Sequence, residues 1–205
     1  MVPPDIFLGI DFGTSNSSIA YVINDPVEQG KQVRVKTVQI ENDESSGGVS
    51  VRMPTLLFID PTSGGKSEVL LGWEVLRKFA EDRESFFLRH GEDFFRSIKS
   101  DIGSSRIYPH ASSPELNTPE KVMAAVIRFL LREAERELGE GCLDRARVVV
   151  TVPASLSAHA RAATKEAVIM AGVAADRLEL IDEPIAALID FLHAPKSSLF
   201  LTPDT

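Results

Sequence analysis

The residues best suited to chemistry lie in one short stretch, residues 9–16, which reads Gly-Ile-Asp-Phe-Gly-Thr-Ser-Asn between two apolar runs. This pattern predicts a tight hairpin that wraps a phosphate. Gly13 lacks a Cβ, so backbone amides can approach an anion there and the φ angle can be positive. Successive amides in such a turn form an anion-binding concavity. Asp11 ends the first strand, where its carboxylate can hold Mg²⁺ through the waters of the ion. Short side-chain donors follow the glycine: Thr14, Ser15 and Asn16.

A second segment, residues 182–187 (Asp-Glu-Pro-Ile-Ala-Ala), lies far downstream. Glu183 follows a predicted strand and precedes a helix that begins at Pro184, and ligands bind at this edge of open α/β sheets. Its carboxylate is suited to orienting a metal-bound water or accepting its proton. Taken singly, each segment also has a plain structural interpretation. The first is then a Gly-Thr hairpin with an Asp at its mouth, and the second a carboxylate that caps a helix.

Composition and charge exclude several classes of protein. The 205 residues suffice for one large domain or two small ones, and the hydrophobic fraction of 43% is ordinary for a soluble globular protein. The net charge of −8 argues against a nucleic-acid groove, which needs clustered Lys and Arg. Cys142 is the single cysteine, so no internal disulfide forms. Residues 1–5 do not resemble a signal peptide, and the apolar runs are too short to span a bilayer. We therefore expect a cytoplasmic protein with no membrane or nucleic-acid partner.

The surrounding residues predict the elements that must position these segments. Three apolar stretches joined by short links predict antiparallel strands at 5–11, 17–23 and 33–40. Residues 41–116 are less regular, and we interpret them as an inserted α+β subdomain. Its predicted elements are strands at 55–59 and 69–72 and helices at 73–81 and 92–98.

Regular alternation of helix and strand returns after residue 117. Thr118 and Ser157 are predicted helix caps, and a β-branched run at 148–152 predicts a strand covered on both faces. A further strand at 177–182 leads into the last helix. Since parallel crossovers are right-handed, the order βββ, insertion, αβαβα predicts a mixed five-stranded sheet with helices on its faces. The last helix carries one apolar stripe that we expect to be buried: Ile185, Leu188, Ile189 and Leu192.

Together, the two segments resemble the actin-like ATPase superfamily, and within it the seventy-kilodalton heat-shock chaperones (DnaK-like proteins). Residues 11–16 are similar to the first phosphate loop of that superfamily. Residues 97–103, Ser-Ile-Lys-Ser-Asp-Ile-Gly, resemble the segment that carries the catalytic lysine of the chaperones. Four further runs extend the resemblance along the chain: 150–154, 161–167, 171–172 and 181–188. The chain departs from the family at Asp182, where Asn is commoner, and at Ser155-Leu156, where an aromatic pair is usual.

The resemblance implies a ribonuclease-H-like sheet (βββαβαβα) built from residues 1–40 and 117–193, with residues 41–116 inserted. Residues 194–205 would begin a linker to a second lobe. It also implies ATP or ADP and Mg²⁺ as cofactors, bound between the two lobes, and a peptide client or co-chaperone as partner. A chain that holds the first lobe alone is expected to bind ATP weakly and to turn it over negligibly.

The resemblance also implies roles for single residues. Thr14 and Ser15, with amides from Gly13 to Asn16, would hold the β- and γ-phosphates. Asp11 and Glu183 would bind Mg²⁺ through water and help to position the attacking water. Lys99 would stabilise charge that develops on the γ-phosphate, since phosphoryl transfer depends on fixed cations.

Pro153 and Arg161 resemble the relay between the nucleotide site and the peptide-binding domain. The alternatives are a Pro153 that merely ends a strand, an Arg161 that faces solvent and a Lys99 that is a solvated surface lysine. At the level of the whole protein the alternatives are a regulator that binds nucleotide without hydrolysis, an actin-like filament protein, or a sugar or acetate kinase.

Overall fold

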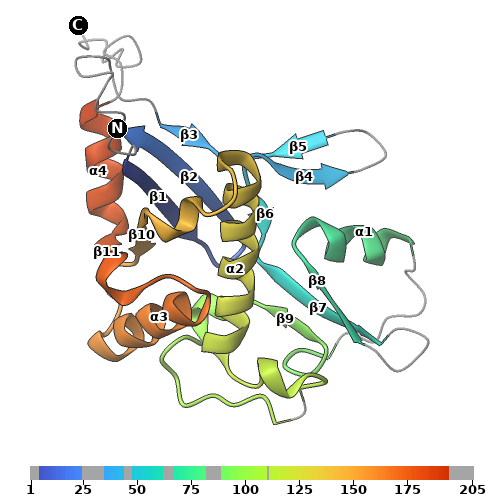
Figure 1. The fold of residues 1–205 in the computed structure, drawn as a ribbon. Helices are drawn as coiled ribbons and strands as arrows, with labels where there is room; N and C mark the ends of the chain where they lie inside the picture. Colours follow the sequence, from blue (N-terminus) through green and yellow to red (C-terminus); the bar gives the residue numbers. More distant parts are fainter. Residues whose placement is uncertain are drawn as a thin grey trace, which may run out of the picture.

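The computed structural model describes residues 5–24, 35–43, 48–61, 67–81, 89–109 and 111–193. Within these ranges the chain forms a mixed α/β fold with one large sheet, two smaller sheets and four α-helices (Figure 1). The large sheet and the helices around it hold most of the buried apolar residues.

The large sheet joins the beginning and the end of the described chain. Its order is β11-β10-β1-β2-β3, and β6 pairs with the start of β2. The pairs β1–β2 and β2–β3 are antiparallel, whereas β1–β10 and β10–β11 are parallel. The predicted mixed sheet is confirmed, with three antiparallel strands and two parallel ones, but β6 makes it a sheet of six strands in the described structure and not the five predicted. The bounds are β1 (Asp5–Phe12), β2 (Asn16–Asn24), β3 (Lys36–Thr37), β6 (Met53–Pro54), β10 (Ala146–Val152) and β11 (Leu178–Asp182).

The predicted third strand, over 33–40, is only partly right. β3 holds two of its residues, and Ile40 begins a different strand, β4 (Ile40–Asp43), which pairs with β5 (Gly48–Ser50) in a separate sheet. Residues 33 and 34 lie outside the described part of the chain. Neither β5 nor β6 was predicted, because strands of two or three residues are too short to show a periodic pattern.

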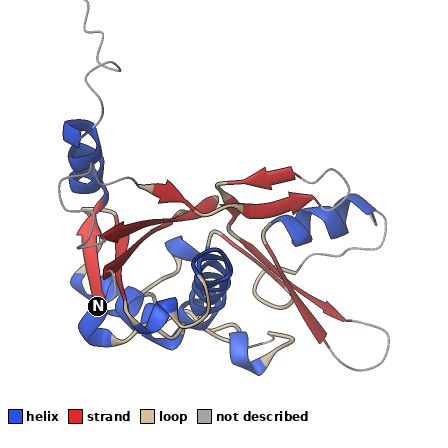
Figure 2. Ribbon diagram, turned by 45° about the horizontal axis from the view of Figure 1, so that its top comes forward, coloured by secondary structure: helices blue, strands red, loops and turns tan. Residues whose placement is uncertain are grey.

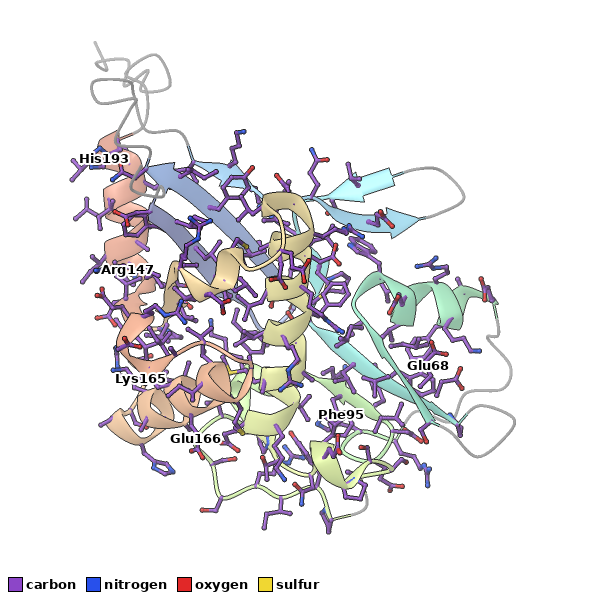
Figure 3. The ribbon with its side chains drawn as sticks, viewed as in Figure 1. Glu68, Phe95, Arg147, Lys165, Glu166 and His193 are labelled. Atoms are coloured by element: carbon purple, nitrogen blue, oxygen red, sulfur yellow. The ribbon has the colours of Figure 1, made fainter. Side chains whose placement is uncertain are left out.

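One face of the large sheet is buried beneath α2 (Pro119–Leu138) and α3 (Ala158–Met170). Alternate residues of β1 are buried, as a strand with one covered face requires: Ile6, Leu8, Ile10 and Phe12. Both predicted caps form, since the hydroxyls of Thr118 and Ser157 accept hydrogen bonds from amides in the first turns of α2 and α3. On α3, Ala160, Ala163 and Ala167 are buried, while Lys165 and Glu166 point outward (Figure 3).

The second small sheet corrects one prediction. It consists of β8 (Ser67–Leu71), β7 (Leu56–Pro61) and β9 (Phe94–Arg96), with α1 (Trp73–Glu81) packed beside it. The predicted helix over 92–98 is wrong, because Phe94 and Phe95 pair with β7 as a strand. Strand geometry sends the two neighbouring rings to opposite faces. Phe95 thereby enters the main core and Phe94 a smaller cluster with Phe58. Short 3₁₀ turns also occur: Ile98–Ser100, Pro114–Leu116, Cys142–Asp144 and Ala175–Arg177.

The last helix, α4 (Glu183–His193), corrects another prediction. Figure 2 shows α4 at the edge of the sheet beside β11, away from the long helix α2. The stripe that was expected to be buried is 45–69% exposed: Ile185, Leu188, Ile189 and Leu192. Periodicity identified the apolar stripe of the helix, but the stripe is exposed and no residue of α4 is buried in the described structure.

Candidate functional site

A cleft of about 610 Å³ opens at the carboxyl ends of β1 and β10, bordered by α4. Five residues predicted for the site line it, from three segments remote in the sequence: Asp11, Gly13, Thr14, Lys99 and Glu183. The expectation that Asp11 and Glu183 face a shared cleft is therefore confirmed. Four residues complete the lining: Thr151, Ala186, Ala187 and Asp190. Glu183 and these three α4 residues recur every three or four positions, so one face of α4 forms a wall of the cleft.

Thr151 fixes the carboxylate of Asp11. The two residues are register partners in the parallel pair β1–β10, and the Thr151 hydroxyl donates to Asp11 Oδ1 at 3.0 Å. This contact orients a carboxylate that lies at the end of a strand, on the uncovered side of the sheet. Sequence reasoning missed Thr151. The available signal was a hydroxyl residue in a run of valines, on a strand predicted to end beside the first hairpin.

Lys99 and Glu183 form an ion pair within the cleft. Lys99 Nζ lies 2.6 Å from Glu183 Oε1, and the side chains are 16% and 41% exposed. The interpretation of Lys99 as a solvated surface lysine is therefore wrong. The pair links the 3₁₀ turn Ile98–Ser100 to the first residue of α4.

The backbone around Lys99 is held in an unusual shape. Ser97, which precedes the 3₁₀ turn, adopts a left-handed conformation with φ 55°, which is uncommon for a residue with a side chain. Gly103, with φ 71°, ends the segment against α3, where an added Cβ would lie 2.5 Å from the Cα of Ala160. The amide of Gly103 also donates to Glu120 Oε1 at 3.2 Å. The ends of the segment are thus fixed, and Lys99 is directed toward the cleft.

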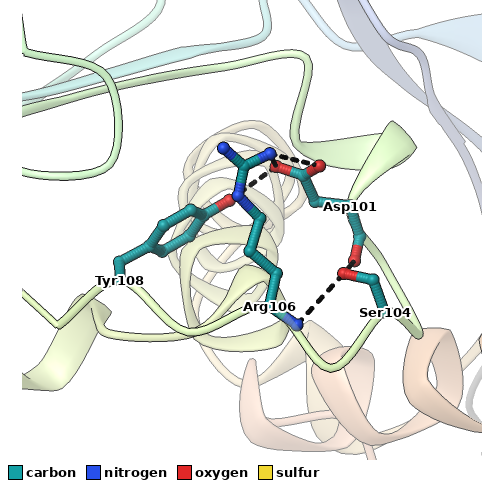
Figure 4. A network of polar contacts seen from close by, with 4 residues as sticks. All are labelled: Asp101, Ser104, Arg106 and Tyr108. Carbon is teal, nitrogen blue, oxygen red and sulfur yellow. Dashed lines mark hydrogen bonds and ion pairs between the residues drawn. The ribbon is translucent and has the colours of Figure 1, made fainter.

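A polar network holds the residues that follow Lys99 (Figure 4). Arg106 Nη1 donates to both carboxylate oxygens of Asp101, at 2.9 and 3.0 Å, and the Tyr108 hydroxyl donates to Asp101 Oδ2 at 2.9 Å. Ser104 Oγ donates to the carbonyl of Asp101 and accepts from the amide of Arg106. Burial, followed by the contact with Asp101, raises the pKa of Tyr108 well above its ordinary value. Tyr108 therefore stays protonated, and keeps donating to Asp101, up to a higher pH than an ordinary tyrosine does.

The first hairpin needs its glycine, although for a different reason from the one expected. The φ angle of Gly13 is not in the left-handed region, but a Cβ on Gly13 would lie 2.1 Å from the carbonyl oxygen of Asn16. Gly13 and Thr14 line the cleft, whereas Ser15 and Asn16 are not among its lining residues. Their backbones pair with β6 and its neighbour instead: the carbonyl of Ser15 accepts from the amide of Thr55, and Asn16 is the register partner of Pro54.

Pro153 and Arg161 are in direct contact beside the cleft. Arg161 Nη2 donates to the Pro153 carbonyl at 3.4 Å, and Arg161 Nε donates to the Leu156 carbonyl at 3.2 Å. The same Nη2 forms an ion pair with Asp182 Oδ1 at 2.5 Å. The interpretation of Arg161 as a solvent-facing residue is therefore wrong.

Among the described residues, no cluster of three His, Cys, Asp or Glu side chains has an arrangement that could hold a metal ion. Likewise, no helix in the described ranges combines the length and the apolar character needed to cross a bilayer.

Comparisons with known proteins agree with the motifs. The sequence model of the Hsp70 protein family matches residues 94–191. The chain is 30% identical over 201 residues to the chaperone protein DnaK of Burkholderia cenocepacia (strain HI2424). It is 26% identical over 204 residues to the mitochondrial iron-sulfur cluster biogenesis chaperone of Saccharomyces cerevisiae. Each alignment covers 90% of this chain but only 27% and 29% of those proteins, so the chain spans less than a third of the length of the curated relatives it matches. The resemblance found in the motifs is confirmed: this chain is similar to the Hsp70 (DnaK-like) chaperones over 90% of its length.

Proposed function

We propose that this chain is a nucleotide-binding lobe of a DnaK-like ATPase, which binds MgATP in the cleft and, in the whole protein, hydrolyses it to gate a peptide or partner. The observation that carries the proposal is the convergence of Asp11, Lys99 and Glu183 on one cleft, from three segments of the chain. A pair of carboxylates and one held lysine are the charges that phosphoryl transfer needs.

The cleft fits a nucleotide phosphate and its metal ion. Its volume of about 610 Å³ lies within the usual range for small-molecule sites. The turn at Gly13 has no room for a Cβ, so the backbone there can lie close to a ligand. Asp11 and Glu183 offer carboxylate oxygens at the same cleft, and Mg²⁺ in proteins is usually held by one or two carboxylates, waters and phosphates. ATP/ADP and Mg²⁺ are accordingly the proposed cofactors.

The residues of this chain then have distinct tasks. Thr14 and the amides at Gly13 and Thr14, which line the cleft, hold phosphate oxygens, whereas Ser15 and Asn16 shape the turn through their pairing with β6 and its neighbour. Lys99 supplies a fixed positive charge where negative charge develops. Asp11, oriented by Thr151, and Glu183, bound to Lys99, hold the waters of the ion and orient the attacking water. When bound, Mg²⁺ neutralises the phosphate charge.

The proposal extends to the domain organisation of the chain. We propose that the large sheet is ribonuclease-H-like and that residues 1–40 and 117–193 supply five of its strands, with 41–116 inserted as a smaller subdomain that adds only β6 to this sheet. Residues 194–205, which lie outside the described part of the chain, would lead to a second lobe. That lobe would close the cleft and cover the exposed apolar stripe of α4, since the relatives are more than three times as long as the aligned region. A cytoplasmic protein that acts on peptides and co-chaperones fits this description.

Nucleotide binding tests the proposal directly. We expect calorimetry on the intact protein to detect MgADP binding that Asp11→Asn weakens at least tenfold. Glu179→Gln, which removes a carboxylate from the exposed side of β11, serves as the control and leaves the affinity unchanged. Equal MgADP affinity for Asp11→Asn and the parent protein would contradict the assignment of the cleft.

A regulator that binds nucleotide without hydrolysis is the second candidate. It would need Gly13 and Thr14 but not Lys99. The ion pair of Lys99 with Glu183 favours hydrolysis, because it holds a lysine at 16% exposure inside the cleft. Nucleotide-dependent light scattering would test the remaining alternative, that the protein forms actin-like filaments.

A further inference from the structure

Two consecutive carboxylates stand where β11 meets α4, and each binds a cation from a different part of the chain. Asp182 pairs with Arg161 of α3, and Glu183 pairs with Lys99 of the 3₁₀ turn. Two ion pairs therefore hold this junction. Only the second of them lies among the residues that line the cleft.

The two carboxylates diverge because of strand geometry. Asp182 is the register partner of Val152, a residue buried on the face of the sheet that α2 and α3 cover. Partners in a sheet share a face, and the next residue along a strand points to the other one. Asp182 therefore reaches α3, while Glu183 turns toward the cleft on the opposite side.

Arg161 connects Asp182 to the loop that follows β10. Its guanidinium donates to the carbonyls of Pro153, Ala154 and Leu156, which belong to the loop after β10. The Arg161–Asp182 pair consequently joins the loop after β10, the first turns of α3 and the last residue of β11.

Packing alone holds the start of α4 weakly. No residue of the helix is buried in the described structure, and Glu183 itself is 41% exposed. Apolar burial is what usually fixes the position of a helix, so a contact at its first residue has more influence here than in a buried helix. The Arg161–Asp182 pair acts on the residue directly before it.

We propose that Asp182 is a positioning residue: its ion pair with Arg161 holds the β11–α4 junction so that Glu183 keeps its contact with Lys99. The effect on catalysis rests on the proposed function, whereas the effect on the Lys99–Glu183 contact does not. The experiment therefore has one arm without nucleotide and one arm with it.

The first arm measures how fast an amine-reactive reagent labels Lys99 in the intact, nucleotide-free protein, read by mass spectrometry. Glu183→Gln sets the rate expected when the ion pair is lost. We expect Asp182→Asn to raise the Lys99 labelling rate about threefold, in line with a partly exposed pair. Asp182→Glu should restore the parent rate, and Asp182→Asn should add nothing in a protein that already carries Glu183→Gln. The labelling rate of Lys165 in the same protein is the internal reference. Glu179→Gln, which removes a carboxylate from the same strand as Asp182, is the matched control variant.

The second arm measures single-turnover hydrolysis of MgATP and the affinity for MgADP. We expect Asp182→Asn to slow hydrolysis about threefold, the same factor as in the labelling, with the affinity for MgADP within twofold of the parent. If the parent protein neither binds nor hydrolyses nucleotide, the proposed function is refuted. The first arm stays valid, because it measures Lys99 labelling without nucleotide.

The proposal fails if Asp182→Asn leaves the labelling of Lys99 at the parent rate. It also fails if the labelling of Lys165 rises equally, because Asp182 would then stabilise the fold in general. Additive effects of Asp182→Asn and Glu183→Gln on Lys99 would overturn it as well, since Asp182 would then act independently of Glu183.

Discussion

Lys99 Nζ and Glu183 Oε1 lie 2.6 Å apart, although 84 residues separate the two positions in the chain. One comes from the 3₁₀ turn after β9 and the other begins α4. Their contact closes one side of a cleft that also contains Asp11.

Removing the lysine should affect the chemical step. We expect Lys99→Ala to slow MgATP hydrolysis by the intact protein roughly a hundredfold, because deleting one group that stabilises transition-state charge costs about 3 kcal/mol. Single-turnover measurements at saturating nucleotide check this, with Lys165→Ala on the outer face of α3 as the control. An unchanged rate in Lys99→Ala would favour the non-hydrolysing regulator.

The hairpin offers a matched pair of glycines. A Cβ at Gly13 would lie 2.1 Å from the Asn16 carbonyl oxygen, whereas a Cβ at Gly9 has nothing within 4 Å. We expect Gly13→Ala to cost on the order of 1–3 kcal/mol of stability through overpacking and to abolish measurable MgADP binding. Gly9→Ala should be neutral or stabilising by up to roughly 1 kcal/mol. Chemical denaturation and calorimetry measure both effects, and equal behaviour of the two variants would refute the steric argument.

For nucleotide affinity, the hydroxyl group of Thr151 should matter more than the size of the Thr151 side chain. Thr151→Val keeps the shape of the side chain but removes the hydrogen bond to Asp11 Oδ1. A hydrogen bond to a charged group contributes about 1.5 kcal/mol or more, so the Mg²⁺-dependent affinity for ADP should fall about tenfold. Thr37→Val, on the exposed strand β3, is the control. Should Thr151→Val bind MgADP as tightly as the parent, Asp11 would not depend on Thr151.

The network around Asp101 predicts a dependence of stability on pH. The pKa of Tyr108 in the folded chain is raised above its ordinary value of 10.0, first by burial and then by Asp101. The folded state therefore holds this proton more tightly than the unfolded state. The resulting stability is fully present below pH 10 and is lost as the pH rises toward the folded pKa. Tyr21, whose pKa is also raised, contributes in the same direction.

Tyr108→Phe isolates that contribution. The variant should be less stable than the parent at pH 8, and the difference in free energy of unfolding should shrink between pH 10 and pH 11.5. Urea unfolding across this range measures it. A difference that stays constant with pH would show that Tyr108 does not titrate differently in the two states.

Several features could be predicted from local pattern alone. The capping residues Thr118 and Ser157, the strand at 148–152 and the hairpin at Gly13 follow from rules that act within a few residues. The mixed character of the large sheet, with antiparallel strands first and parallel strands later, followed from short links and from the alternation of helix and strand. The errors occur where distant partners decide. Phe94 and Phe95 form a strand because β7 offers free backbone groups, and β7 lies more than 30 residues earlier.

The sequence by itself determined the residue types of the site and the elements that carry them. Asp11, Lys99 and Glu183 were each identified from local spacing and family resemblance. Tertiary structure alone decided that Thr151 orients Asp11, that Arg161 binds Asp182 and that the apolar stripe of α4 faces outward. The physical reason is that periodicity states which residues share a face, whereas the partner of that face depends on how segments far apart in the chain pack together.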